Sequence, residues 1–113
     1  MTISDLLKEI PMEVICGNDN LDVEISRGFS SDMMSNVIAK GGEGDLWITF
    51  QTHMNVIAIA QLKKMAGIIL IQDRKLIPKA LEKAESIGLP VLESPLGAFE
   101  LGGRLYNLGI HGD

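Results

Sequence analysis

The sequence predicts an α/β fold: a single three-layer α/β/α domain whose mostly parallel sheet has about five strands. Short aliphatic or β-branched runs alternate with segments of helical periodicity, which is the pattern of a parallel sheet connected by helices. Residues 67–71 form a continuous aliphatic run between turn residues, as expected of a central strand buried on both faces. Because we find no internal repeat, linker or boundary, we expect one domain that spans residues 1–113.

The first quarter of the chain predicts a short helix followed by two strands. Ser4 is placed to cap a helix of one or two turns, which Pro11 ends because the residue before a proline avoids helical geometry. Residues 12–16 are expected to form a strand that stops at a turn of Gly, Asn and Asp. The second strand is expected at residues 23–29.

The next predicted helix has a polar start and one apolar face. Three residues are placed to cap it: Ser30, Ser31 and Asp32. Its apolar residues recur at the spacing of one helical face: Met33, Met34, Val37 and Ile38. We interpret Met33 and Met34 as core residues rather than as a flexible binding face, and the glycine-rich turn at residues 41–44 ends the helix.

The centre of the chain predicts two strands joined by a helix. Residues 45–50 are rich in β-branched and aromatic side chains, which favour a strand. Residues 54–65 are apolar in their first half and basic at their end, where cations suit the helix dipole. This helix is expected to pack on the sheet and to lead into the central strand at residues 67–71.

The last third predicts a helix, a short strand and a final amphipathic segment. The helix begins at Pro78 and ends at Gly88, since proline favours the first helical position and glycine the residue after the last. Residues 89–92 form the short strand. Residues 95–109 form the amphipathic segment.

Two adjacent glycines, Gly102 and Gly103, lie inside this last helical pattern. Each glycine in a helix interior costs up to about 1 kcal/mol relative to alanine, so a compensating role is expected. Close helix packing, contact with another subunit, and a break between two short helices would each account for the pair. We predict that Gly102, Gly103 and Tyr106 form an interface.

Composition narrows the possible partners. The net charge is −5, with 10 Lys and Arg against 15 Asp and Glu, which disfavours binding along a nucleic acid but leaves a single nucleotide open. The lone cysteine, Cys16, and two distant histidines offer neither an internal disulfide nor a metal cage, so no metal or cofactor is expected. The first residues do not resemble a signal peptide, and no apolar stretch is long enough to span a membrane. These two features predict a cytoplasmic protein without a membrane partner.

The chain also lacks the motifs of common catalytic and phosphate-binding sites. The turn at residues 41–44 follows a helix and precedes a strand, which is the reverse of a phosphate-binding loop, and acids follow its glycines. No dinucleotide fingerprint, nucleophile elbow or zinc-protease motif occurs. We therefore expect no enzyme activity and no catalytic residue.

Residues 49–55 run off the carboxyl end of a predicted strand, where open α/β sheets place their ligands. Period-two alternation would aim Thr49, Gln51 and His53 to one side, beside the free amides of the following helix. A small polar or anionic ligand would fit there. Alternatively, Thr52 or His53 caps the helix, Asn55 satisfies the loop backbone and Gln51 is solvated.

Two further loops share this predicted edge. Residues 72–75 follow the central strand and residues 93–96 follow the last strand, so together they could complete a crevice. The first loop is otherwise a solvated turn, and Ser94-Pro95 is otherwise a cap and first helical turn.

Five segments together resemble the DRTGG domain: GFSSDMM at 28–34, WITFQ at 47–51, NVIA at 55–58, GLPVL at 88–92 and LGGRLY at 101–106. The resemblance covers residues 10–109, although the letters DRTGG themselves do not occur. The closing part also resembles the N-terminal domain of HPr kinase/phosphorylase. The resemblance implies an α/β/α domain, found alone or beside CBS domains and phosphotransacetylase, without an assigned catalytic residue.

The resemblance also bears on the site and the function. Asp32, Thr49, Gln51 and Asn55 stand in the matching segments and, with His53, are the predicted ligand-binding residues; the alternative for Asp32 is a charge at a helix N-terminus. The implied function is a non-catalytic regulatory domain that senses a small metabolite or nucleotide and acts through contacts with an unidentified protein. The competing hypothesis is a structural homo-oligomeric domain without ligand. A domain of this size buries limited surface, so at least a dimer is expected.

Overall fold

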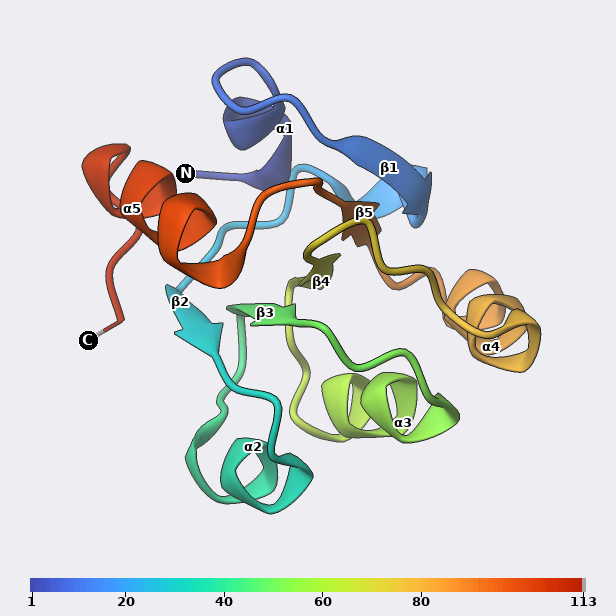
Figure 1. The fold of residues 1–113 in the computed structure, drawn as a ribbon. Coiled ribbons are helices and arrows are strands. Elements are labelled where there is room, and N and C mark those ends of the chain that lie inside the picture. Colours follow the sequence, from blue (N-terminus) through green and yellow to red (C-terminus); the bar gives the residue numbers. More distant parts are fainter. Residues whose placement is uncertain (113) are drawn as a thin grey trace.

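A computed structural model, which describes residues 1–112, places five strands in one sheet between two layers of helices (Figure 1). The strands are β1 (Glu13–Cys16), β2 (Arg27–Ser30), β3 (Asp45–Thr49), β4 (Gly67–Leu70) and β5 (Val91–Glu93). Their order across the sheet is β1-β5-β4-β3-β2. β2 to β5 are parallel to one another and β1 pairs antiparallel with β5, which confirms the predicted mostly parallel sheet.

The helices lie on both faces of this sheet. They are α1 (Ile3–Leu7), α2 (Met34–Lys40), α3 (Met54–Leu62), α4 (Pro78–Ile87) and α5 (Ala98–Asn107), and a short 3-10 helix spans Asn18–Asn20. α1 and α5 cover one face, while α2, α3 and α4 cover the other (Figure 1). The predicted three-layer α/β/α fold is therefore confirmed.

Each face of the sheet has its own hydrophobic core. Ile68 and Leu70 of β4 point into the core beneath α2, α3 and α4, whereas Ile69 points into the core beneath α1 and α5. All four residues of β4 are buried, so the prediction of a central strand buried on both faces is confirmed. The second core includes Leu101 and Leu105, which anchor α5 to the sheet.

The predicted core face of α2 is only partly correct, since Met34 packs partly buried against the core but Met33 and Ile38 do not. Only Val37 is buried in this helix, and Met33 and Ile38 have 66% and 47% of their surface exposed. α2 follows β2 at the margin of the sheet, so little of its surface reaches the core. The prediction of residues 23–29 as a strand is also too long, because β2 begins at Arg27.

The structure separates the alternatives for the glycine pair. α5 is continuous from Ala98 to Asn107, so the hypothesis of a break between two short helices is wrong. A Cβ atom on Gly102 or Gly103 would meet no atom within 4 Å, so close packing inside the domain is wrong as well. Of the three explanations, contact with another chain remains.

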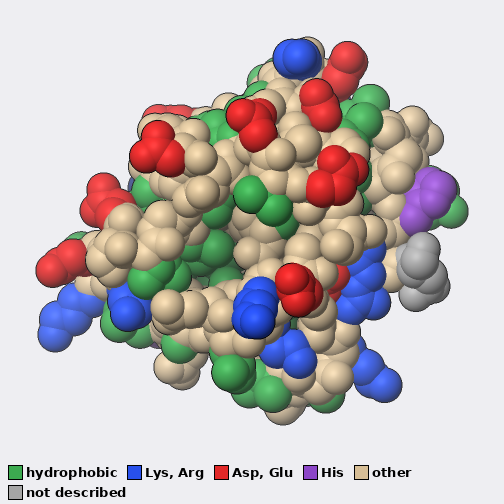
Figure 2. All heavy atoms as spheres, turned by 180° about the vertical axis from the view of Figure 1, so that it is seen from behind, with side chains coloured by type: hydrophobic (Ala, Val, Ile, Leu, Met, Phe, Trp, Pro, Cys, Tyr) green, Lys and Arg blue, Asp and Glu red, His purple; other side chains and the backbone are tan. Residues whose placement is uncertain are grey.

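Charge is unevenly distributed over the surface. On the face shown in Figure 2, acidic side chains gather over the upper half, basic side chains lie mostly lower, and hydrophobic atoms are exposed in the hollowed region between them. Among residues 1–112, no group of three His, Cys, Asp or Glu side chains is arranged to hold a metal ion. None of the helices in the same range has the length and apolar character needed to cross a bilayer.

Candidate functional site

Four helices, α2 to α5, begin at the carboxyl edge, the side of the sheet where β2 to β5 end. Their N-cap residues are Met33, His53, Ile77 and Gly97, and none of these donates or accepts a capping hydrogen bond through its side chain. α1 lies elsewhere and has a complete capping box formed by Thr2 and Asp5. Helices that start at the carboxyl edge thus present first-turn amides and the positive end of the dipole without a side-chain partner.

Three of the five predicted ligand-binding residues form one hydrogen-bonded group. Asp32 Oδ1 accepts hydrogen bonds from Thr49 Oγ1 at 2.7 Å and from the Phe50 amide at 2.9 Å. Gln51 Nε2 donates to the Asp32 carbonyl at 3.0 Å, and the Gln51 amide donates to Thr49 Oγ1 at 3.2 Å. The group joins the segment after β2 to the end of β3, so Asp32 does not cap α2 as the sequence suggested.

His53 and Asn55 do not belong to this group. Both are exposed, and within the described part of the chain neither side chain makes a hydrogen bond. His53 is the N-cap of α3 by position only, so the alternative in which its side chain caps the helix is wrong. Thr52 does not cap α3 either, and its carbonyl accepts a hydrogen bond from the Ile77 amide at 3.1 Å. That bond places the starts of α3 and α4 beside each other.

The loop after β4 is held more firmly than a solvated turn. The Gln72 amide donates to the Leu96 carbonyl at 2.9 Å and the Asp73 amide donates to the Ser94 carbonyl at 3.0 Å. Both residues adopt the left-handed region, with φ of 56° for Gln72 and 58° for Asp73. The loops after β4 and β5 therefore lie side by side.

Arg74 reaches from this loop to the loop after β3. Its Nε donates to the Phe50 carbonyl at 3.3 Å, and its guanidinium carbon lies 5.3 Å from the centre of the Phe50 ring. A cation over an aromatic face is held in place while its remaining N–H groups stay available. Arg74 thus brings a charged donor to the loop between β3 and α3.

Lys75 and Glu93 are an ion pair rather than free ligand-binding groups. Lys75 Nζ lies 2.8 Å from Glu93 Oε1, and this hydrogen bond raises the pKa of the lysine. Ser94 is fully buried and its Oγ accepts from the Leu96 amide at 3.1 Å. Ser94 therefore closes a local turn and does not cap α5, which starts at Ala98.

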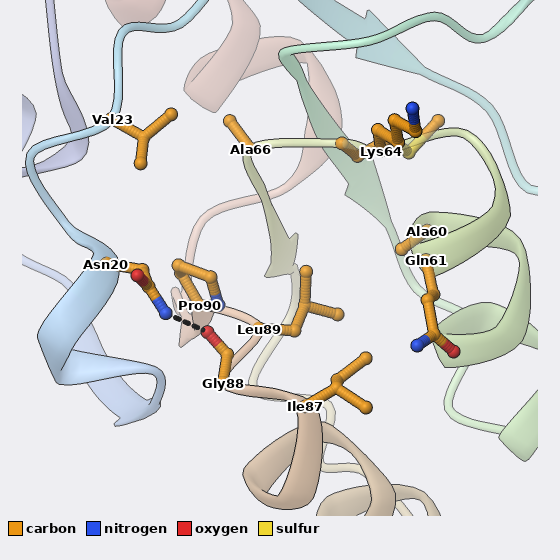
Figure 3. Close-up of a pocket in the computed structure, with 11 residues that line it drawn as sticks. Asn20, Val23, Ala60, Gln61, Lys64, Ala66, Ile87, Gly88, Leu89 and Pro90 are labelled. Carbon is orange, nitrogen blue, oxygen red and sulfur yellow. Dashed lines mark hydrogen bonds between the residues drawn. The ribbon is translucent and has the colours of Figure 1, made fainter.

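A hollow lies at the other end of the sheet, where the sequence predicts no site. A cavity of about 250 Å³ opens there between α3, α4 and the turn that holds Asn20 (Figure 3). Asn20 Nδ2 donates to the Gly88 carbonyl at 2.7 Å across its rim. Its lining is mainly apolar, with Gln61 and Lys64 as the other polar side chains. Five cavities on residues 1–112 are lined by residues other than the five predicted ligand-binding residues.

The predicted interface residues lie on the outer side of α5. Gly102 and Tyr106 line a small cavity of about 140 Å³ against β2 and the C-terminal segment, and Gly103 is exposed. The Tyr106 ring is stacked on that of His111 with their centres 4.2 Å apart.

Cys16 offers no nucleophile. Its thiol is buried and donates to the Leu89 carbonyl at 3.3 Å. Burial raises the pKa of the thiol, and the carboxylate of Glu85 acts in the same direction, so the reactive thiolate is disfavoured.

No protein-family model and no curated protein matches this sequence. The structure of this chain is similar to a solved structure, that of the CBS and DRTGG domains of the regulatory region of a pyrophosphatase from Clostridium perfringens. That structure is a complex with the activator diadenosine tetraphosphate. The TM-score is 0.77 at 16% sequence identity. The likeness covers 92% of this chain and 45% of the other, so this chain spans less than half the length of that neighbour.

At this identity the likeness establishes the fold. It agrees with the resemblance carried by the five sequence segments and with the observed sheet between two helical layers. The chain has a DRTGG-like fold.

Proposed function

We propose that this chain is a non-catalytic regulatory domain that binds a small metabolite or nucleotide at the carboxyl edge and passes the signal on through protein–protein contacts. The proposal includes residues 1–113 as one DRTGG-like domain, working in the cytoplasm. It is supported by the solved neighbour, which is a regulatory region in complex with a nucleotide activator. No metal or catalytic residue enters the proposal.

The observation that carries the proposal is the pair of uncapped helix starts at the carboxyl edge. α3 and α4 are nine and ten residues long, and a hydrogen bond from Ile77 to Thr52 holds their starts together. First-turn amides without a side-chain cap, and the positive ends of two neighbouring helix dipoles, favour an anionic group such as a phosphate. Arg74 adds a charged donor, and the exposed His53 and Asn55 add two polar side chains beside the same amides.

The group around Asp32 fits the sugar or base of such a ligand. Its Oδ1 is occupied by Thr49 and Phe50, whereas its Oδ2 accepts no hydrogen bond from the described residues. A carboxylate oxygen of this kind accepts hydrogen bonds from hydroxyl or amino groups. Thr49 and Gln51 hold the carboxylate in position, so in this proposal they act on the ligand through Asp32.

Thermal melting with and without ligands tests the proposal. The ligands are ATP, diadenosine tetraphosphate, acetyl phosphate and, as the phosphate-free comparison, adenosine. At about 100 times its Kd a ligand adds about 2.7 kcal/mol, which raises the Tm of a domain this size by roughly 10 °C. We expect this shift for a phosphate-containing ligand and its loss in Arg74→Ala.

Lys8→Ala is the matched control, because it removes a cation from the surface near α1 and should leave the shift unchanged. Lys64→Ala reports on the cavity of Figure 3 at the other end of the sheet. If no phosphate ligand shifts the Tm, or if the shift is lost in Lys64→Ala and kept in Arg74→Ala, the proposed site is wrong.

One observation favours a second function, a structural homo-oligomeric domain without ligand. Phe99 and Tyr106 on α5 are 95% and 61% exposed, and a surface that groups apolar side chains is typical of a contact with another protein. In that case the function of the domain is to hold two copies together, without binding a ligand. A flat melting panel in an assembled, folded protein would favour this function over the first.

A further inference from the structure

The outer face of α5 carries Phe99, the most exposed of the large hydrophobic side chains in the described chain. Phe99 is 95% exposed and Tyr106 is 61% exposed. They are seven residues apart, which is about two helical turns, so their side chains lie on the same side of the helix. The opposite side is anchored in the core by Leu101 and Leu105.

The surface between the two aromatic residues is open down to the backbone. Gly102 and Gly103 lie there, and a Cβ atom on either would meet nothing within 4 Å. Glycines on a helix surface let another helix approach closely, because no side chain separates the backbones. The surface at Gly102 and Gly103 therefore leaves room for the backbone of another helix to approach.

The flanking residues are arranged symmetrically about this gap. The midpoint of Phe99 and Tyr106 falls between the two glycines, and the midpoint of Glu100 and Arg104 falls at Gly102. In an antiparallel pair of identical helices, positions on either side of a common midpoint face each other across a two-fold axis. Phe99 then meets Tyr106 of the second copy, and Glu100 meets its Arg104.

The charges select this orientation. At about 100° per residue, Glu100 and Arg104 lie on one flank of the helix and the aromatic residues on the other. Within one chain Glu100 and Arg104 form an exposed ion pair at 3.4 Å, so both side chains are already placed on that flank. An antiparallel partner places the two charged flanks on the same side of the pair, where Glu100 meets Arg104, whereas a parallel partner places each charged flank against the aromatic flank of the other helix.

We propose that two copies of this chain associate about a two-fold axis through α5, with the helices antiparallel and crossing at Gly102 and Gly103. The proposal goes beyond ligand binding and does not depend on it. α5 has ten residues and is about 15 Å long, so the contact is at the small end of specific interfaces and the dimer should dissociate on dilution.

Charge reversal tests the orientation by sedimentation velocity. Glu100→Arg places like charges in both cross-contacts of a dimer, and so does Arg104→Glu, so we expect each variant alone to dimerise at least about tenfold more weakly. An equimolar mixture of the two variants restores opposite charges at both contacts, and we expect a mixed dimer. Each variant keeps like charges within its own helix, so recovery on mixing cannot come from the pair within one chain.

Gly103→Lys is the second test, because the open space around Gly103 accepts a side chain and the change improves helix propensity. We expect a folded monomer by circular dichroism and sedimentation. Glu82→Arg on the exposed side of α4 is the matched charge change and should leave the dimer intact. A wild-type chain that stays monomeric at every concentration overturns the proposal, as does a dimer that survives Gly103→Lys or a mixture that forms no mixed dimer.

Discussion

Helix ends at the amino edge and at the carboxyl edge of the sheet differ in whether they are capped. At the amino edge, where α2 and α4 finish, the helix ends have partners: Lys63 Nζ donates to the Ile38 carbonyl at 2.8 Å, and Gly88 ends α4 in the left-handed conformation at φ 70°. At the carboxyl edge, none of the helices that begin there has a side-chain cap.

The cavity and the ordered polar groups also lie at different edges of the sheet. The amino edge holds the apolar hollow of about 250 Å³, with few polar groups to orient a ligand. The carboxyl edge holds the ordered polar groups and the uncapped helix starts, and the five cavities on residues 1–112 lie outside the Asp32 group. A ligand there would lie on an open surface, so closure by another chain or domain would strengthen its binding.

The largest expected effect comes from the amino edge. Asp45 is 1% exposed, its Oδ1 lies 2.8 Å from Arg27 Nε, and its Oδ2 accepts from the Gly42 amide at 2.8 Å. Asp45→Ala leaves these donors without their acceptor, so we expect a loss of about 3 kcal/mol in the free energy of unfolding, measured in urea. A loss below about 1 kcal/mol would show that the amino edge does not depend on this pair.

The next effect concerns the group at the carboxyl edge. Thr49→Val keeps the shape of a buried side chain and removes the hydroxyl that joins Asp32 to the Gln51 amide. We expect the unfolding free energy to fall by about 1–2 kcal/mol and ligand binding to weaken with it. Thr49→Ser retains the hydroxyl and should retain binding, and equal binding by the valine and serine variants would contradict the role given to Asp32.

A smaller effect tests the capped end of α4. Gly88→Ala forces a Cβ atom into the left-handed region and to 2.9 Å from Asn20 Nδ2. We expect a loss of about 1 kcal/mol in stability by thermal melting, with nucleotide binding at the other edge unchanged. Loss of nucleotide binding in a folded Gly88→Ala variant would show that the amino and carboxyl edges of the sheet are coupled.

The smallest effect has the opposite sign for stability and binding. His53→Asp supplies α3 with the side-chain cap that it lacks, and we expect a gain of about 0.5–1 kcal/mol in unfolding free energy. The same carboxylate occupies the amides proposed for the phosphate and should weaken nucleotide binding. His53→Ala is the control without a cap, and stronger binding by the aspartate variant would argue against an anion at this position.

The predictable parts of the fold are those with local signals. Pro78 and Gly88 marked both ends of α4, and the aliphatic run at residues 67–71 marked the buried β4. The orientation of Asp32 was not predictable, because Thr49 lies 17 residues away and only the pairing of β2 with β3 brings them together. The sequence placed Thr49 and Gln51 at the right edge but could not show that Asp32 completes their hydrogen bonds.

The amino-edge cavity had no sequence signal for a similar reason. Its lining comes from the turn at Asn20, the end of α3 and the segment after α4, which no local pattern relates. The exposed side of α5 was partly predictable, since Gly102 and Gly103 are unfavourable inside a helix without a reason. The symmetric placement of Phe99 and Tyr106 became visible only once α5 was known to be continuous.

A titration of the ¹⁵N-labelled protein with ATP, followed by the backbone amide resonances, tests directly whether the carboxyl edge binds a nucleotide. If the carboxyl edge binds the phosphates, the largest shifts will fall on Asn55, Val56 and Arg74, with smaller ones at residues 79–81. Largest shifts on residues 60–66 and 87–89 around the amino-edge cavity, or no movement of any resonance, would contradict binding at the carboxyl edge.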